Sequence, residues 1–150
     1  MNKKISIILS TYNEKTSINY TINQLIKNLP DVEIVVVDDN SPDGTYEELK
    51  KINYPKLKIF SRKKNRGLAT AFLTGLINTD GDIVGWLDSN MGVLANHFPK
   101  MINELSSSDI VLLSRYVHGG TDQRNFMRVM SSRLINGLAR IILRSNIKDL

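Results

Sequence analysis

Short apolar runs alternate with segments of helical periodicity along almost the whole chain. Runs of four or five mainly apolar residues predict strands that are buried on both faces. These runs are 5–9, 34–37, 57–60, 83–87 and 110–113. Between and after them, apolar residues recur three or four positions apart, which predicts helices. These segments are 18–29, 46–52, 68–76, 98–105 and 126–143. Short connections between strands and helices predict an α/β fold, a Rossmann-like, mostly parallel sheet with helices on both faces.

The length of 150 residues is enough for one domain with a hydrophobic core. With 41% hydrophobic and 23% charged residues, the composition excludes collagen, coiled coil and wholesale disorder. No apolar run reaches the roughly 18 residues that a membrane span needs, and the run at 5–9 is too short for a signal peptide. The absence of cysteine excludes disulfides and thiolate metal sites. These features fit a reducing compartment, so we expect a cytoplasmic protein.

The net charge of +5 is concentrated at the carboxyl-terminal end. Residues 122–150 hold six basic and two acidic residues, whereas the first 121 are nearly neutral. We therefore divide the domain into a core, 1–121, and a basic amphipathic helical end, 122–150. Such an end fits an anionic partner, or simply a solvated helix face. We expect no nucleic acid partner, because no pattern of stacking aromatic side chains accompanies the charge.

Polar residues follow every predicted strand. In parallel sheets ligands bind beyond the carboxyl ends of the strands, so these residues form the candidate site. After the second strand, Asp38 and Asp39 are placed to accept hydrogen bonds from a ribose or a base edge. Asp43 instead belongs to a turn sequence, Asn-Ser-Pro-Asp-Gly. After the fourth strand, Asp88 and Asn90 offer oxygen atoms of the kind that bind Mg²⁺ or Mn²⁺ beside a diphosphate.

The segment after the first strand has two open interpretations. Thr11 and Glu14 have the spacing of a helix capping box, and Tyr12 is suited to stacking on a base. Other nucleotide motifs are missing, since the sequence has neither G-x-G-x-x-G after the first strand nor G-x-x-x-x-G-K-[ST]. The histidines, His97 and His118, show no metal-ligand spacing.

Six strings in this order and spacing resemble one protein family. They are STYNE (10–14), VVVDDNSPDGT (35–45), NRGLATAFLTG (65–75), GDIVGWLDSN (81–90), SRYVHGG (114–120) and the pair Arg128 and Ser132. Together they resemble family 2 glycosyltransferases of the GT-A fold, and most of all the polyprenyl (dolichyl) phosphate mannosyltransferase and glucosyltransferase branch. The resemblance covers essentially the whole chain. It implies an inverting enzyme that moves mannose or glucose from GDP-mannose or UDP-glucose to a polyprenyl phosphate.

The resemblance also implies roles for matching residues. A nucleoside pocket would be lined by Tyr12, Glu14, Val37 and Asp39, to which we add the adjoining Thr11, Asp38 and Ser89. Asp88 and Asn90 would stand at the Asp-x-Asp motif for the divalent cation and the diphosphate. Arg115 would neutralise phosphate, and Arg128 with Ser132 would hold the acceptor phosphate. Among these, the residues expected to carry catalysis are Asp88, Arg115 and Arg128.

The implied chemistry needs no catalytic base, because a lipid phosphate is already an anionic nucleophile. The tasks left to the protein are positioning and stabilisation of the departing diphosphate, to which a cation and arginines are suited. The basic end would then lie on the cytoplasmic face of an anionic membrane as a peripheral helix. Alternatively, it packs its apolar face on the sheet.

Some positions depart from the family pattern. Ser10 replaces a usual proline, and Asn90 replaces the second acid of Asp-x-Asp, which removes one carboxylate from the metal site. We also expect the chain to stop short of the rest of the acceptor site, because family members continue beyond the segment at 147–150. A saccharide acceptor and a catalytically weak nucleotide-sugar-binding module therefore remain alternatives. The sequence leaves the base, the sugar and the oligomeric state open.

Overall fold

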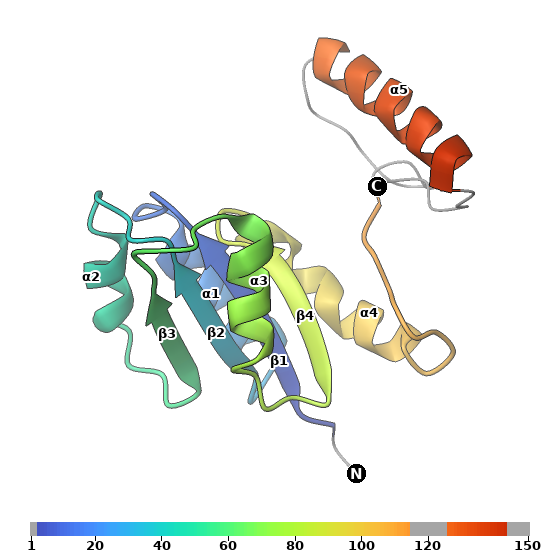
Figure 1. The fold of residues 1–150 in the computed structure, drawn as a ribbon. Coiled ribbons are helices and arrows are strands. Elements are labelled where there is room, and N and C mark those ends of the chain that lie inside the picture. Colours follow the sequence, from blue (N-terminus) through green and yellow to red (C-terminus); the bar gives the residue numbers. More distant parts are fainter. Residues whose placement is uncertain (1–2, 115–125, 144–150) are drawn as a thin grey trace. The chain divides into compact units, whose positions relative to one another are not determined.

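The computed structural model describes residues 3–114 and 126–143. The chain divides into two compact units, Met1–Ser108 and Asp109–Leu150. The first unit holds a sheet and its helices, and the second holds the long helix α5, Phe126–Leu143 (Figure 1). This helix confirms the prediction over 126–143. No helix in the described ranges is long and apolar enough to cross a membrane. The functional division at residues 121 and 122 stays a prediction.

Four parallel strands form the sheet. They are β1 (Ile5–Thr11), β2 (Glu33–Asp38), β3 (Leu57–Ser61) and β4 (Ile83–Asp88). Their order in the sheet is β3-β2-β1-β4, and all three neighbouring pairs are parallel. The structure thus confirms the predicted α/β fold and four of the five predicted strands.

The strand order reverses at β1. From β1 the chain proceeds through β2 to β3 on one side, and it then crosses to β4 on the other side. The strand ends meet in register, with Ser10 opposite Asp88, Thr11 opposite Asp38, and Asp38 opposite Ser61. Ligands of open parallel sheets bind outside the carboxyl ends where the strand order reverses. The fold therefore brings the segments after β1, β2 and β4 to one edge.

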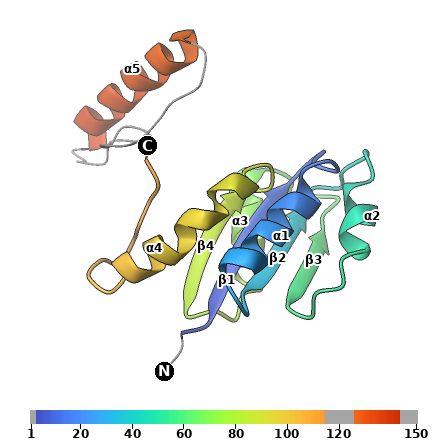
Figure 2. The ribbon, with the colours of Figure 1, turned by 180° about the vertical axis from the view of Figure 1, so that it is seen from behind.

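Helices cover both faces of the sheet (Figures 1 and 2). The helices α1 (Ile18–Asn28) and α4 (Phe98–Glu104) lie on one face, and α3 (Leu68–Leu76) lies on the other. The short helix α2 (Thr45–Lys50) follows β2. A 3-10 helix, η1 (Gly92–His97), precedes α4, and the sequence pattern did not predict it.

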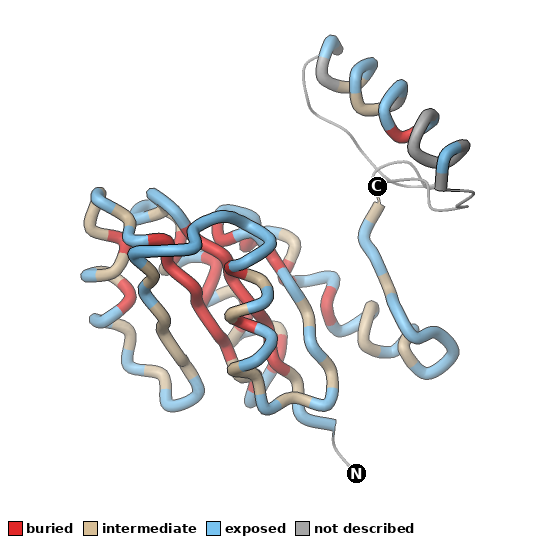
Figure 3. Tube along the Cα trace, viewed as in Figure 1, coloured by how far each residue is buried: buried red, intermediate tan, exposed pale blue. Residues whose placement is uncertain are grey.

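The core lies between α1 and the two central strands, which are the most deeply buried part of the sheet (Figure 3). Helix α1 buries apolar residues that recur with the spacing of one helix face, Ile18, Ile22 and Leu25. They pack with alternate residues of the strands, Ile7, Leu9, Ile34 and Val36. The intervening strand residues, Ile8, Val35 and Val37, are also fully buried, on the opposite face. Each such side chain contributes about 1.5–3 kcal/mol by leaving water.

Helix α3 approaches the sheet closely at Gly75. A Cβ atom at this position would lie 2.4 Å from Ile8 Cγ2, well inside van der Waals contact. A glycine is therefore required for α3 to rest on β1 at this distance. This packing fixes the helix whose first residues border the site.

The predicted fifth strand over 110–113 is wrong. The structure gives these residues no strand pairing, and Ile110 and Leu112 are 77% and 61% exposed. An apolar run indicates only that a segment would gain free energy by burial. A strand also needs hydrogen-bonding partners on a neighbouring strand, and the local sequence does not specify them.

Candidate functional site

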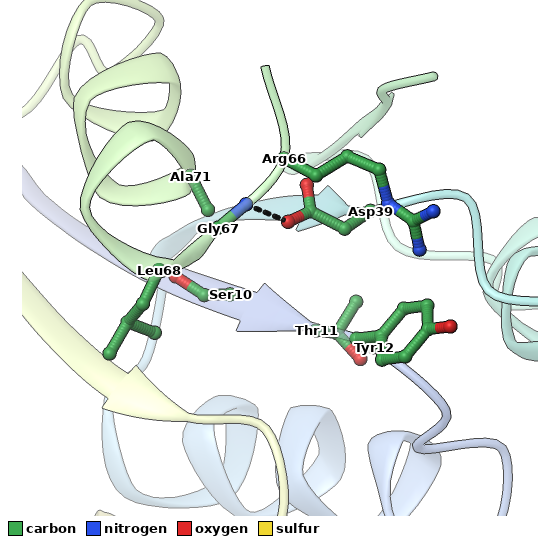
Figure 4. Close-up of a pocket in the computed structure, with 8 residues that line it drawn as sticks. All are labelled: Ser10, Thr11, Tyr12, Asp39, Arg66, Gly67, Leu68 and Ala71. Carbon is green, nitrogen blue, oxygen red and sulfur yellow. Dashed lines mark hydrogen bonds between the residues drawn. The ribbon is translucent and has the colours of Figure 1, made fainter. Parts of the chain in front are cut away.

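A pocket of about 460 Å³ opens at the carboxyl edge of the sheet (Figure 4). Its walls come from the ends of β1 and β2 and from the start of α3. They are formed by Ser10, Thr11, Tyr12, Asp39, Arg66, Gly67, Leu68 and Ala71. Three of these, Thr11, Tyr12 and Asp39, belong to the donor nucleotide set predicted from the sequence.

The end of β1 contributes a buried hydroxyl and an open aromatic ring. Thr11 is 4% exposed, and its Oγ1 has no hydrogen-bond partner among the residues that the structure describes. Tyr12 is half exposed, and the guanidinium carbon of Arg66 lies 4.8 Å from the centre of its ring. Because buried polar atoms are normally hydrogen-bonded, this enclosed hydroxyl is an exception within the described structure. The ring and the guanidinium are both suited to a flat aromatic partner.

Asp39 is held by two groups from the segment between β3 and α3. Arg62 Nε donates to Asp39 Oδ1 at 2.9 Å, and Arg62 Nη2 donates to the same oxygen. The Gly67 N–H donates to Asp39 Oδ2 at 2.6 Å, the bond drawn in Figure 4. The side chains of Asp39 and Arg62 are each 11% exposed. Charge-assisted hydrogen bonds out of water are strong, so the carboxylate has a fixed orientation.

Arg66 and Gly67 were not among the predicted site residues, and Arg62 was indicated only as a polar residue after the third strand, without a role. Gly67 has a φ of +124°, a backbone conformation that side chains other than glycine rarely adopt. This conformation lets its N–H reach Asp39 directly before α3 begins. The available signals were the polar Ser61-Arg62 pair after the third strand and the string NRGLATAFLTG. Neither signal shows which of its residues faces a ligand.

Asp38 and Val37 lie inside the fold and do not line the pocket. Both are fully buried. The Asp38 carboxylate accepts a hydrogen bond from the Ser41 N–H at 3.1 Å and another from the Ser41 hydroxyl. Successive residues of an extended chain point to opposite sides. Asp38 therefore secures the turn, while its neighbour Asp39 reaches the pocket.

The segment after β2 is a turn, as the sequence predicted for Asp43. Asp43 accepts hydrogen bonds from the Thr45 hydroxyl at 2.6 Å, the Thr45 N–H at 2.9 Å and the Lys15 N–H at 3.1 Å. These bonds, and that of the Thr45 hydroxyl first, lower the pKa of Asp43 below its ordinary value. Thr45 Oγ1 also accepts from the Glu14 N–H at 3.0 Å, which ties the segments after β1 and β2 together.

Glu14 joins the segment after β1 to the segment after β4. Asn90 Nδ2 donates to Glu14 Oε1 at 2.9 Å, and the Ser17 hydroxyl donates to Glu14 Oε2 at 2.5 Å. The capping-box interpretation of Thr11 and Glu14 is wrong. Thr11 is the last residue of β1, and α1 begins only at Ile18, so neither residue caps this helix.

Asp88, Ser89 and Asn90 alternate between outward and inward positions. Asp88 and Asn90 are exposed, whereas Ser89 is buried and its carbonyl accepts from the Thr21 hydroxyl at 2.6 Å. The described part of the chain holds no group of three His, Cys, Asp or Glu residues that could bind a metal. Divalent cations such as Mg²⁺ are often held by one or two carboxylates together with substrate phosphates. The Asp88 carboxylate and the Asn90 carbonyl oxygen fit a cation bound in this shared way.

The residues predicted to neutralise phosphate and to hold the acceptor phosphate belong to the second unit. Arg115 lies outside the described residues. Arg128 and Ser132 both lie on α5, and Ser132 is half-buried. The side chain of Arg128 is outside the described part of the structure. The roles of these three residues stay predictions.

The sequence matches the model of one protein family over nearly its whole length. Residues 6–149 match glycosyl transferase family 2. The chain belongs to this family. The match confirms the resemblance carried by the six sequence strings.

Among curated proteins, this family 2 chain is similar to the dolichol-phosphate mannosyltransferase of Pyrococcus furiosus. The two are 34% identical over 146 residues, which cover 93% of this chain and 41% of the relative. The chain thus spans less than half the length of that protein.

Two solved structures extend the likeness to the fold. Glucosyl-3-phosphoglycerate synthase from Mycobacterium tuberculosis, in complex with Mn²⁺, UDP and glucosyl-3-phosphoglycerate, has a TM-score of 0.68 at 24% identity, and the match covers 95% of this chain and 51% of that one. The mannosyltransferase PcManGT from Pyrobaculum calidifontis, in complex with GDP-Man and Mn²⁺, has a TM-score of 0.56 at 27% identity and covers 65% and 32%. The family 2 chain therefore has the predicted GT-A fold. Both neighbours hold a divalent cation.

Proposed function

We propose that this chain binds the donor of an inverting glycosyltransferase that moves a hexose, mannose first of all, from a nucleoside diphosphate sugar to a polyprenyl phosphate. The observation that carries the proposal is the pocket at the carboxyl edge of the sheet. It combines the Tyr12 ring beside Arg66 with the fixed Asp39 carboxylate. An aromatic face, a cation and a carboxylate suit a nucleobase and a ribose. The mannosyltransferase relative from Pyrococcus furiosus supports the choice of sugar and acceptor.

In this proposal the diphosphate extends from the pocket toward Asp88 and Asn90. Those residues hold the divalent cation, Mg²⁺ or Mn²⁺, and the Mn²⁺ in the neighbouring structures supports such an ion. When bound, the cation stabilises negative charge on the departing diphosphate. Asn90 also holds Glu14 through its amide, so it orders the segment beside the diphosphate as well.

The acceptor side of the proposal rests on α5. The acceptor phosphate is already ionised, so Arg128 and Ser132 have only to bind and orient it, while Arg115 neutralises phosphate charge. Exposed apolar residues of α5 recur along the helix at Met127, Met130, Leu134 and Ile142. A helix with such a stripe and several arginines in its sequence suits the surface of an anionic membrane. We therefore propose peripheral attachment at the cytoplasmic face of a membrane.

The first test is calorimetric titration with GDP, UDP, GDP-mannose and UDP-glucose, each with Mn²⁺, with Mg²⁺ and with neither cation. We expect cation-dependent binding of one nucleotide and its sugar. Absence of binding under all conditions would overturn the proposal. Transfer to a polyprenyl phosphate, and none to a free saccharide, then identifies the acceptor.

One observation favours a second function, a catalytically weak nucleotide-sugar-binding module. Asn90 donates its amide to Glu14, where a second acid would have supplied another carboxylate to the cation. If the donor binds but no sugar is transferred to polyprenyl phosphate in vesicles, this second function replaces the first.

A further inference from the structure

We propose that Arg62 is a positioning residue of the donor pocket, which holds Asp39 and the segment 62–67 in the arrangement that receives the nucleoside. The inference rests on the proposed function, because it takes the pocket to be the donor site. Arg62 is absent from the residues that line the pocket. It therefore acts through Asp39 and Gly67, which do line it.

The guanidinium of Arg62 joins three parts of the fold. Nε and Nη2 donate to Asp39 Oδ1 at the end of β2. Nη2 also donates to the Gly67 carbonyl at 3.2 Å, and Nη1 donates to Thr74 Oγ1 on α3 at 3.2 Å. The Arg62 N–H donates to the Asp38 carbonyl at 2.8 Å, which fixes where the side chain starts. A planar fork with five donors can make these contacts at once, whereas a lysine ammonium cannot.

This arrangement leaves Asp39 with a defined capacity for a ligand. In the described structure, Oδ1 accepts two N–H groups from Arg62 and Oδ2 accepts one from Gly67. A carboxylate has about four acceptor sites, so Oδ2 retains one for an N–H or O–H of the nucleoside. The positive charge of Arg62 also offsets the cost of keeping this carboxylate away from water. A pre-oriented acceptor binds a ligand more tightly because little conformational entropy is lost on binding.

Lys58 provides a matched control on the same strand. It lies near the amino end of β3, away from the pocket at the carboxyl ends of the strands. Its Nζ lies 2.7 Å from Glu33 Oε1 and 2.5 Å from Asp80 Oδ2. It does not line the pocket. Replacing either cation by methionine removes a charge from β3 or its end. If Arg62 serves stability alone, both folded variants should bind the nucleotide with similar affinity.

The experiment measures the dissociation constants of UDP and GDP with Mn²⁺ by calorimetry, at a temperature where circular dichroism shows every variant folded. For the nucleotide that wild type binds, we expect Arg62→Met to raise the constant about ten- to a hundredfold, the range for a lost charged hydrogen bond. Arg62→Lys should fall between wild type and Arg62→Met, since it restores charge without the fork. Lys58→Met should stay within about twofold of wild type, because its ion pair is remote from the ligand.

The Gly67 amide proton supplies a spectroscopic readout. Its hydrogen bond to Asp39 places its resonance at low field, and Arg62→Met should shift it upfield while Lys58→Met leaves it in place. Wild-type affinity in Arg62→Met, or equal losses in the two methionine variants, would overturn the inference and leave the proposed function standing. Failure of wild type to bind either nucleotide would overturn both. If Arg62→Met does not fold, an unchanged affinity and Gly67 shift in Arg62→Lys would overturn the inference.

Discussion

An ion pair lies at each end of the strands, which we call the amino edge and the carboxyl edge of the sheet. The cation of each pair lies on β3 or directly after it, but the two pairs differ in their surroundings. At the carboxyl edge, Arg62 and Asp39 are each 11% exposed, and Asp39 forms part of a pocket wall. At the amino edge, Lys58 is 37% exposed and its partner Asp80 is 74% exposed. The first pair is held away from water beside an open pocket, whereas the second is open to water through Lys58 and Asp80, although Lys58's other partner, Glu33, is only 14% exposed.

At the amino edge, the half-buried acceptor group also has all of its hydrogen-bond donors supplied by the fold. The Glu33 carboxylate accepts from Lys58 at 2.7 Å, from the Ser6 hydroxyl at 2.5 Å and from the Asp80 N–H at 2.9 Å. At the carboxyl edge, by contrast, the Thr11 hydroxyl is buried without a partner in the described structure. The comparison shows that a charged pair can serve stability alone where its carboxylate is surrounded by donors, and can also serve binding where Asp39 Oδ2 keeps a free acceptor site beside a pocket.

The largest expected effect follows removal of the buried anion by Asp39→Ala. The Arg62 charge would remain buried without its partner, and breaking such a pair costs about 3–5 kcal/mol. Nucleotide binding should be lost as well. Urea unfolding and calorimetry measure the two effects. The control is Asp80→Ala at the amino edge, which should lower the free energy of unfolding by under about 1 kcal/mol because Asp80 is exposed. Equal losses of stability in the two variants would contradict the proposed difference between the two edges.

A smaller loss is expected for Gly67→Ala. A side chain at a φ of +124° is strained, at a cost of about 1–3 kcal/mol. Thermal unfolding should show a lower midpoint, and the bond to Asp39 should weaken, so nucleotide affinity should fall. Gly137→Ala in α5 is the control, because a Cβ there meets nothing within 4 Å and alanine favours a helix by about 0.5–1 kcal/mol. A Gly67 variant as stable as wild type would contradict the structure of this turn.

Lys58→Met should change stability by about 1 kcal/mol, because the ammonium group is itself open to solvent and exposed ion pairs contribute little, and Glu33 keeps its hydrogen bonds from Ser6 and Asp80. The wild-type contribution should shrink further at high salt, since solvent-exposed charges are screened. Urea midpoints of both proteins at low and high salt measure this. A loss as large as that of Asp39→Ala would show that the amino edge is as sensitive as the carboxyl edge.

The smallest effect concerns pH. Burial raises the pKa of Glu33, but hydrogen bonds from Lys58, Ser6 and Asp80 outweigh it, so the pKa lies below its ordinary value of 4.5. A carboxyl group with a lowered folded pKa stabilises the fold above its unfolded pKa, and this contribution is lost as pH falls through the folded value. Urea midpoints of wild type should therefore decline as the pH is lowered from neutral through the acidic range. In Glu33→Gln the urea midpoint should decline less steeply with falling pH. An unchanged slope would show that Glu33 does not contribute to the pH dependence of stability.

Much of the fold was determined by the sequence itself. The apolar runs at 5–9 and 34–37 are local signals of buried strands, and the spacing of Ile18, Ile22 and Leu25 is a local signal of a helix face. The connections between them then imply a parallel sheet. Because a parallel sheet has one carboxyl edge, the sequence also predicted where Tyr12, Asp39 and Asp88 would be found.

Only the tertiary structure decided which polar residues face the pocket. Asp38 and Asp39 are adjacent and chemically identical, yet one secures Ser41 and the other lines the wall. Arg62 and Gly67 meet Asp39 across more than twenty positions of sequence, and the run 110–113 lacks the strand partner that its composition suggested. Apolar periodicity is a property of neighbouring residues and can be recognised in the sequence. Hydrogen-bond partners come from distant segments and exist only once the sheet has brought those segments together.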